Sequence, residues 1–160
     1  MKSALAATAI SAFALSIGVS SSTAQAPAVD HLTRAQLTEM AQKLATEGQV
    51  SGSASTKIAD YPNHYTMISL REKSGGAEIH ENFADFFIVV QGHATLVSGG
   101  KVVDAKTVSA GETRGASVQD GTQQSLNPGD VVHIPAGVPH QMLLANGDAI
   151  TYFVIKVREK

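Results

Sequence analysis

The apolar positions of the chain follow two different spacings, one before and one after residues 51–55. Between Thr33 and Glu47 they recur three and four residues apart, which is the spacing of one buried helical face. These apolar residues are Leu37, Met40, Ala41 and Leu44. Thr33 and Gln36 form a capping box, and Gly48 is suited to end a helix. We predict an amphipathic helix packed on the outside of the domain or against a second copy, with a partner-binding helix as the alternative.

After a small-residue linker, Ser51–Ser55, the pattern changes to short β-rich runs that alternate apolar and polar residues. Gly, Asn, Asp and Pro separate these runs, as they do where turns join strands. The runs predicted as strands are residues 65–71, 77–81, 85–91, 93–98, 130–134, 140–144 and 150–157. Many short strands in one stretch of chain are typical of a sandwich or small barrel, so we predict an all-β domain with one N-terminal amphipathic helix.

Residues 99–128 do not fit this pattern, because they are polar and rich in glycine. Their apolar points are Val102, Val103, Val108 and Val118, together with Leu126 near the end. Long loops inside compact domains are usually functional or mobile. We expect one or two edge strands here, together with an excursion near one mouth of the barrel.

The first residues have the features of an export signal. Met1-Lys2 is a short positive start, Ala4–Val19 is uncharged and mostly apolar, and Ala24-Gln25-Ala26 has the form that signal peptidase reads. A membrane anchor is the alternative, but the run barely reaches the length of a span and lacks a positive stop-transfer flank. We therefore predict a signal peptide at residues 1–26 and a periplasmic or secreted protein.

Composition narrows the class of protein further. Without residues 1–26 the chain has 134 residues, and its 11 Lys and Arg against 14 Asp and Glu give a net charge of about −3. With no basic stripe and few aromatic residues, nucleic acid is an improbable partner. The chain has no cysteine, which excludes disulfides, thiolate zinc sites and cysteine nucleophiles. We expect residues 27–55 to form the helix and linker, and residues 56–160 a single barrel domain that does not contact membranes.

Three polar side chains stand together around the second and third predicted strands. Glu78 and His80 are two residues apart on one strand and therefore face the same side, and Asp85 opens the next strand after a turn. Two carboxylates and an imidazole inside an apolar barrel would be costly unless something satisfies them. A divalent metal ion would satisfy all three.

A second stretch, Gly129–His140, supplies another histidine after a Pro-Ala-Gly turn. Its spacing, G-x5-P-x-G-x2-H, resembles the second motif of the cupin superfamily, G-x5-P-x-G-x2-H-x3-N, with Leu144 at the asparagine position. The resemblance extends over residues 56–157. It implies a cupin-type double-stranded β-helix, a jelly-roll barrel, with a metal near its centre.

The first cupin motif, G-x5-H-x-H-x3-4-E-x6-G, is matched more loosely. Glu78 stands at the first histidine position, His80 at the second, and the shorter Asp85 at the glutamate position before Gly92. The leading glycine is out of register, since Gly75 and Gly76 lie closer to Glu78 than the motif requires. The resemblance implies one divalent transition metal, Fe, Mn, Ni or Zn, bound by Glu78, His80, Asp85 and His140.

Several roles stay open at this point. Glu78 is a ligand, a catalytic base beside the metal or a surface carboxylate on a loop, and Asp85 is either a ligand or a turn residue. A shifted register would place Asn82 beside His80. The remaining histidines are expected to be exposed or structural, with a pocket role as a lesser alternative for His133. They are His31, His64, His93 and His133. Two same-face pairs, Ser69 with Arg71 and Tyr152 with Lys156, are expected to be packed or on the surface rather than in contact with a substrate.

These features favour an exported, metal-dependent enzyme that acts on a small molecule, of the oxygenase, isomerase, lyase or hydrolase type. The expected barrel lining, Phe87, Val89, Met142 and Leu144, would enclose the reacting groups. A non-catalytic module that binds a metal or a small molecule is the first alternative, and a structural or storage role is the second. A homodimer would cover sheet edges.

Overall fold

The computed structural model describes residues 29–48 and 52–159. The predicted signal peptide, residues 1–26, lies outside this part of the chain, and so do residues 49–51 of the predicted helix end and linker. The helix and every strand described below belong to one compact unit, residues 32–160. None of the described helices is long and apolar enough to cross a membrane.

The predicted helix is present as α1, Arg34–Gly48. Its first turn is closed by the capping box: the Gln36 backbone N–H donates to Thr33 Oγ1 at 3.3 Å, and the Thr33 N–H donates to Gln36 Oε1 at 2.8 Å. Two of the N–H groups that a helix start leaves unpaired are thereby satisfied. The start of the helix was therefore predicted for the correct physical reason.

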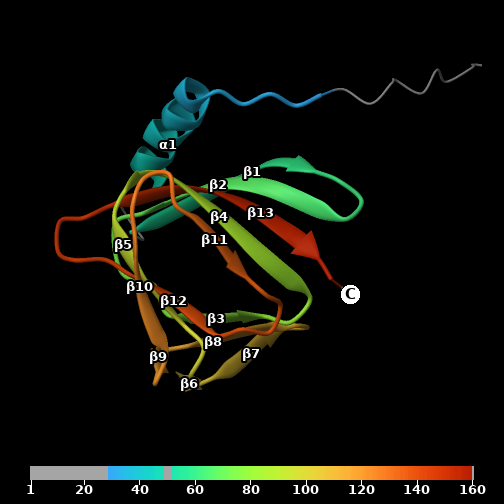
Figure 1. Cartoon of the computed structure of the whole chain (residues 1–160), viewed down its shortest axis with the longest axis vertical. Coiled ribbons are helices and arrows are strands. Elements are labelled where there is room, and N and C mark those ends of the chain that lie inside the picture. The colour runs from blue at the N-terminus through green and yellow to red at the C-terminus, as the bar shows by residue number, and fades with distance from the viewer. Residues whose placement is uncertain (1–28, 49–51, 160) are drawn as a thin grey trace, which may run out of the picture. The chain divides into compact units, whose positions relative to one another are not determined.

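The strands form two large antiparallel sheets and one small one (Figure 1). The five-stranded sheet has the order β1 (Ser53–Asp60), β2 (His64–Arg71), β13 (Ile150–Arg158), β4 (Phe83–Gly92), β11 (Val131–Ile134). The six-stranded sheet has the order β10 (Thr122–Leu126), β5 (Ala94–Ser98), β12 (His140–Leu143), β3 (Ala77–His80), β8 (Glu112–Gly115), β7 (Lys106–Ser109). The small sheet pairs β6 (Lys101–Val103) with β9 (Ser117–Gln119).

The main core lies between the two large sheets. Its buried cluster joins Phe87 and Val89 of the five-stranded sheet to Leu96 and Met142 of the six-stranded sheet, with Leu144 packed partly buried against it. The predicted lining of the barrel is therefore confirmed. Residues two apart on a strand face the same side, so a polar residue two positions from a core residue also points into this interior, as Asp85 does beside Phe87 on β4.

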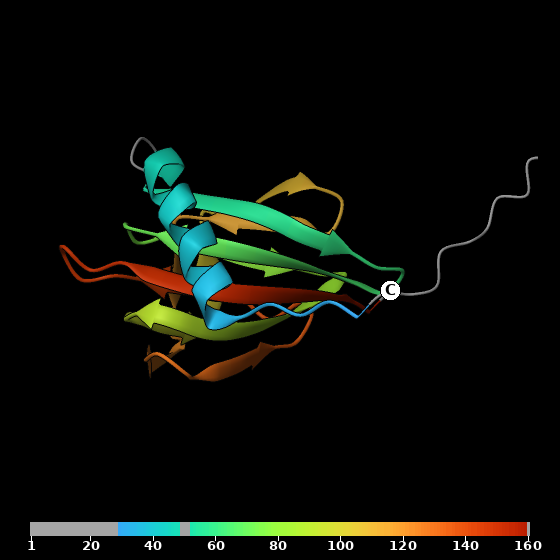
Figure 2. The same cartoon turned by 90° about the horizontal axis from the view of Figure 1, so that it is seen from above.

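A second core lies on the outer face of the five-stranded sheet, beneath α1. Leu44 of the helix packs there with Ile68, Leu70 and Val90. Figure 2 shows the helix lying across this face of the sheet. The helix is thus packed on the outside of the barrel, as its apolar spacing predicted.

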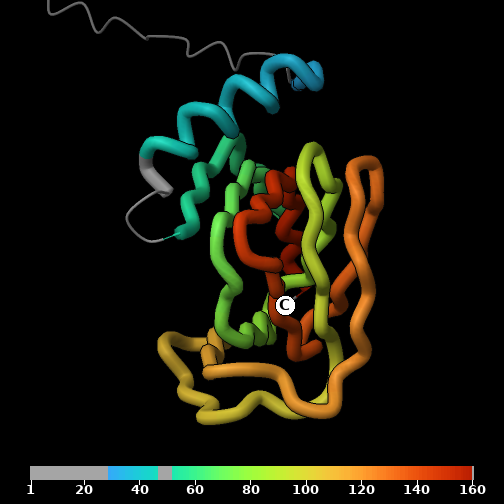
Figure 3. Tube along the Cα trace, turned by 90° about the vertical axis from the view of Figure 1, so that its left-hand side faces the viewer, coloured from blue at the N-terminus to red at the C-terminus, as the bar shows by residue number. Residues whose placement is uncertain are grey.

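All seven predicted strands are present, with ends that move by at most two residues. Two predictions were wrong. The predicted linker is already part of strand β1 from Ser53 onward, and residues 99–128 contain the five strands β6–β10 rather than one or two. Figure 3 shows the yellow and gold part of this segment crossing one end of the barrel. The sequence pattern concealed these strands because each has only three to five residues and none shows a sustained alternation between apolar and polar residues.

Candidate metal centre

Three neighbouring strands of the six-stranded sheet bring the candidate residues into two rows. In the first row, Glu78 of β3 lies between His140 of β12 and Arg114 of β8. In the second row, His80 of β3 lies opposite Glu112 of β8. Directly opposed residues on antiparallel strands have adjacent side chains, so the pairing of these strands assembles the cluster.

Glu78, His80 and His140 converge on one point inside the barrel. Glu78 Oε2 lies 3.4 Å from His80 Nε2 and 4.0 Å from His140 Nε2, and one ligand atom of each residue lies within 4.8 Å of the others. Both histidines are buried. Two atoms bound to the same ion at about 2.1 Å can be at most about 4.2 Å apart, and both of the Glu78 distances fall below that limit.

Hydrogen bonds fix which nitrogen of each histidine faces this point. His80 Nδ1 lies 2.8 Å from Glu112 Oε2, and His140 Nδ1 lies 3.0 Å from the carbonyl oxygen of Val138. A carboxylate and a carbonyl only accept, so both rings donate from Nδ1 and, when neutral, present the Nε2 lone pair inward. His80 Nε2 is buried and has no hydrogen-bond partner among the described residues. The cluster therefore contains buried lone pairs directed at a common centre.

Asp85 lies beside the same point from the opposite sheet, on β4. Its Oδ2 is 3.7 Å from His80 Nε2 and 3.8 Å from His140 Nε2. The ammonium group of Lys156, on the neighbouring strand β13, lies 2.6 Å from Asp85 Oδ1 and 2.7 Å from Oδ2. Asp85 is thus placed close to both imidazoles, but a buried cation already neutralises its charge.

Arg71 holds the other oxygen of Glu78. Its Nη2 donates to Glu78 Oε1 at 3.2 Å, and its Nε donates to the hydroxyl of Tyr152 at 3.0 Å. Burial alone would raise the pKa of Glu78, but the adjacent ring of His80 and the charges of Arg71 and Arg114 lower that pKa to about 2. Glu78 is therefore ionised, as a metal ligand must be, and its Oε2 stays turned toward the histidines.

Burial lowers the pKa of His140 below its ordinary value, because an imidazolium would lose its hydration inside the barrel. The hydrogen bond to the Val138 carbonyl and the nearby carboxylate of Asp85 act in the opposite direction but do not reverse the shift. His140 is thereby kept in the neutral form that binds metals.

A cavity of about 330 Å³ opens beside the cluster. Its walls come from both large sheets and carry acidic, basic and hydroxyl groups. They include Ser69, Tyr65, Tyr152, Glu78, His80, Asp85, Glu112, Arg71, Arg114 and Lys156. The cavity is large enough for a small molecule to lie against Glu78 and His80, two of the three converging side chains.

Comparison with solved structures assigns the architecture. The DMSP lyase DddQ from Ruegeria pomeroyi DSS-3 superposes with a TM-score of 0.51 and 14% identity, and the Schizosaccharomyces pombe Cnp3 cupin domain with 0.50 and 8%. The chain has the cupin fold. The matches cover 69% and 67% of this chain, but only 49% of the lyase and 65% of the Cnp3 chain. No family profile and no curated protein sequence matches the chain.

Within the cupin barrel, the four side chains predicted as ligands lie together, and Glu78 and His80 share a face as expected. Sequence reasoning missed Glu112 and Arg114, which belong to the polar stretch read as an excursion. Nothing in their local pattern marks them, since only the pairing of β8 with β3 brings them to the site.

The same-face pairs of β2 and β13 line the cavity of the candidate site. Ser69, Tyr152 and Lys156 are buried, as the predicted packed placement required, and Arg71 is partly buried. The spacing indicated correctly that each pair shares a face. It did not show that this face is the interior, because Arg and Lys are rarely buried unless they are paired.

The other histidines described by the structure lie outside the cluster. His133 is exposed and stacks on Phe86, and His64 stacks on Tyr61. His31 and His93 are exposed. Asn82 lies in the turn between β3 and β4, so the alternative register that would pair it with His80 is wrong.

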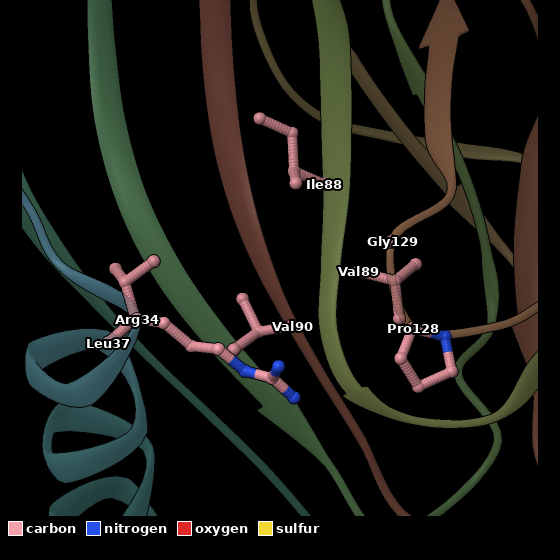
Figure 4. Close-up of a pocket in the computed structure, with 7 residues that line it drawn as sticks. All are labelled: Arg34, Leu37, Ile88, Val89, Val90, Pro128 and Gly129. Carbon is pink, nitrogen blue, oxygen red and sulfur yellow. The ribbon is translucent and has the colours of Figure 1, made fainter.

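A further hollow of about 330 Å³ lies on the helix side of the five-stranded sheet (Figure 4). Its walls come from Arg34 and Leu37 of α1, residues 88–90 of β4, and Pro128 and Gly129 before β11. None of the described residues that line it is a histidine or carries a carboxylate or hydroxyl group. Among the two hollows, only the one inside the cupin barrel holds groups that can perform chemistry.

Proposed function

We propose that the protein is a metal-dependent enzyme that binds one divalent transition metal through Glu78, His80 and His140 and acts on a small molecule in the adjoining cavity. The observation that carries this proposal is the pair of imidazoles fixed with Nε2 turned toward Glu78 Oε2. Such buried lone pairs are costly without a partner, and a metal ion would satisfy all of them.

The donor set fits the metal classes that the sequence suggested. Two imidazoles and one carboxylate without sulfur suit Fe, Mn, Ni or Zn, and three protein ligands leave positions open for a substrate. Hydrogen bonds from metal-binding histidines to a carboxylate and to a backbone carbonyl, as made here to Glu112 and Val138, typically support such sites. When bound, the metal would supply Lewis-acid chemistry and a lowered pKa of coordinated water.

The chain's own residues would position and enclose the reactants. Glu112 and Val138 hold the two imidazoles in the required tautomer, while Arg71 occupies Glu78 Oε1 and leaves Oε2 for the metal. This division favours Glu78 as a ligand over the alternative role of a general base, because Oε2 lies within 4.0 Å of both Nε2 atoms, where one ion could bind all three. We place the reaction among the oxygenase, isomerase and lyase types that the cupin resemblance suggested, with the substrate in the adjoining cavity.

Metal titration tests the proposal directly. Chelator-treated protein should bind about one equivalent of Zn²⁺ or Co²⁺, measured by elemental analysis after dialysis. His140→Ala should abolish that binding, whereas His133→Ala, which removes an exposed histidine of β11, should leave it intact. Absence of a metal equivalent in the wild-type protein, or equal binding by both variants, would refute the proposal.

A second candidate is a non-catalytic cupin module that binds a metal or a small molecule. The observation that favours it is the pairing of Glu78 with Arg71 and of Asp85 with Lys156, which neutralises the charge of both acids without any ion. Turnover of a small organic compound by the loaded protein, lost in folded His140→Ala, would exclude this alternative. Binding of the same compound without turnover would support it.

We also propose that the protein is exported through its first 26 residues. The support is the positive start, the apolar run and the Ala24-Gln25-Ala26 site. Full-length protein expressed in a bacterial host should accumulate outside the cytoplasm with Pro27 as its first residue, as determined by N-terminal sequencing. A cytoplasmic protein that retains Met1 would contradict export and would leave the metal proposal untouched.

A further inference from the structure

We propose that the substrate is a small organic anion, carrying a carboxylate or a phosphate group that Arg71 and Arg114 bind beside the metal. This inference rests on the proposed function, because it concerns the cavity that adjoins the candidate metal centre. It names a class of substrate that the fold alone does not supply.

The argument begins with the charges that line the cavity. Three carboxylates face it, and each lies against a cationic side chain that also faces it. The pairs are Glu78 with Arg71 at 3.2 Å, Asp85 with Lys156 at 2.6 Å, and Glu112 with Arg114 at 3.0 Å. The cavity is therefore electrically balanced as long as both histidines are neutral.

A divalent metal would disturb this balance. Each carboxylate among the described lining residues is already paired with a cation. A divalent metal bound by Glu78, His80 and His140 would therefore give the cavity an excess of about two positive charges. Uncompensated charge in a partly buried site is unfavourable. An anionic ligand would restore neutrality, whereas a neutral ligand would not. Metal and anion should consequently bind with positive coupling.

Arg71 is built to receive such an anion. A guanidinium has five N–H donors, and the hydrogen bonds of Arg71 to Tyr152 and Glu78 use two of them. These two bonds fix the plane of the group before a ligand arrives, which reduces the entropic cost of binding. Gly75 accommodates it, because a Cβ at that position would lie 2.6 Å from Arg71 Nη1.

Arg114 supplies a second cation at the rim of the same cavity. Its Nη1 contacts Glu112 Oε2 and the Thr113 carbonyl, and its side chain is 40% exposed. An exposed arginine can turn toward a ligand at little cost, in contrast to Lys156, which is buried against both oxygens of Asp85. Arginine pairs well with both carboxylate and phosphate, so these two groups are the shared chemistry.

Calorimetry with three matched probes tests the inference. Succinate, methyl phosphate and the neutral succinamide are titrated, at constant ionic strength, into metal-free and Co²⁺-loaded protein. At least one anion should bind the loaded protein about tenfold or more tightly than the metal-free protein, and succinamide should not show this preference. Comparison of the two anions identifies the preferred group. Equal affinity for succinate and succinamide, with methyl phosphate no tighter, would overturn the inference.

Variants test whether the affinity for the anion comes from the two arginines or from the metal alone. Arg71→Lys keeps the charge but removes the planar set of N–H donors, and Arg114→Gln removes an exposed cation. Each should weaken anion binding about tenfold when it is measured on protein saturated with Co²⁺. Lys43→Gln on α1, where the side chain is 73% exposed, is the charge control and should bind like the wild type. Wild-type affinity in Arg114→Gln and in folded Arg71→Lys would overturn the inference.

The two proposals fail separately. If the wild-type protein binds Co²⁺ but shows no preference for the anions, the metal centre stands and the inference falls. If no Co²⁺ binds, the proposed function falls. The metal-free titrations then decide the inference: anion binding that Arg114→Gln abolishes supports it, and absence of such binding overturns it.

Discussion

Glu112 accepts a hydrogen bond at 2.8 Å from Nδ1 of His80, a residue 32 positions earlier in the chain. The contact joins strand β8, in the polar stretch of residues 99–128, to the candidate metal centre on β3. It directs His80 Nε2 toward Glu78 and His140. A segment that looks like a loop in the sequence thus orients a proposed ligand.

Glu112→Gln should weaken metal binding about 10- to 100-fold, because the amide is a weaker acceptor and no longer holds the imidazole in the required tautomer. Competition with a coloured chelator would measure the affinity for Zn²⁺. Glu81→Gln is the matched control, since Glu81 follows His80 directly and is exposed. Unchanged affinity in Glu112→Gln, or an equal loss in Glu81→Gln, would contradict the orienting role.

Lys156→Met should destabilise the metal-free protein by about 3–5 kcal/mol, because it leaves the buried carboxylate of Asp85 without its cation. The double variant Lys156→Met with Asp85→Leu should recover most of that loss. Urea unfolding of the wild type, both single variants and the double variant would give the coupling energy. Simple addition of the two single effects would show that the pair does not act as a unit.

The same substitution should change the response to metal. Asp85 Oδ2 already lies 3.7 Å from His80 Nε2, so a carboxylate released by Lys156 can join the ligand set. Zn²⁺ should therefore raise the melting temperature of Lys156→Met by more than that of the wild type. If the two increases are equal, Asp85 does not become a ligand even when it is free.

Acid should destabilise the fold in a range set by Glu78. Its pKa is about 2 in the folded protein against an ordinary value of 4.5, so the unfolded chain takes up a proton at higher pH than the folded protein. The contribution to stability is complete above about pH 4.5, is lost as the pH falls toward 2, and is on the order of 3 kcal/mol. Burial lowers the pKa of His140 below its ordinary value of 6.5, so the unfolded chain protonates this histidine at a higher pH than the folded protein does. His140 therefore also makes the fold less stable as the pH falls below about 6.5.

Glu78→Gln should remove the Glu78 part of this pH dependence. The difference in unfolding free energy between wild type and variant, from urea titrations of metal-free protein, should shrink as the pH falls from about 5 to 3. A difference that stays constant over this range would show that Glu78 is not ionised at unusually low pH in the folded state.

Leu44→Ala should lower the free energy of unfolding by about 3 kcal/mol, because it empties the apolar contact between α1 and the outer face of the sheet. Affinity for Zn²⁺ should stay unchanged, since the site lies on the inner face. Gln42→Ala, at an exposed position of the same helix, is the control. Loss of metal affinity in folded Leu44→Ala would mean that the helix does more than stabilise the barrel.

Much of this fold was predictable because its signals are local. The capping box at Thr33 and Gln36, and the alternation of apolar residues in strands such as β4 and β13, depend only on near neighbours. The Pro-Ala-Gly turn before His140 is equally local. These signals located the helix, seven strands and the residues that converge on the candidate centre.

The remaining parts depend on pairing between distant segments. β7 is exposed along its whole length, and β1 offers only Ala54 and Ile58 to the core beneath α1, so neither strand shows the alternation of a half-buried strand. Glu112, Arg71 and Lys156 acquire their roles only when β8, β2 and β13 are placed beside the cluster. Buried cations are invisible in a sequence until their carboxylate partners are known.

The ion pairing of each described carboxylate in the cavity with a cationic side chain bears on the order of folding and metal binding. Because Glu78, Asp85 and Glu112 are already neutralised, the polypeptide can close its barrel before any ion arrives. The proposed ion would then be acquired in a separate, later step that depends on supply in the surroundings of the folded protein, and a chelator should empty the centre while the barrel stays intact.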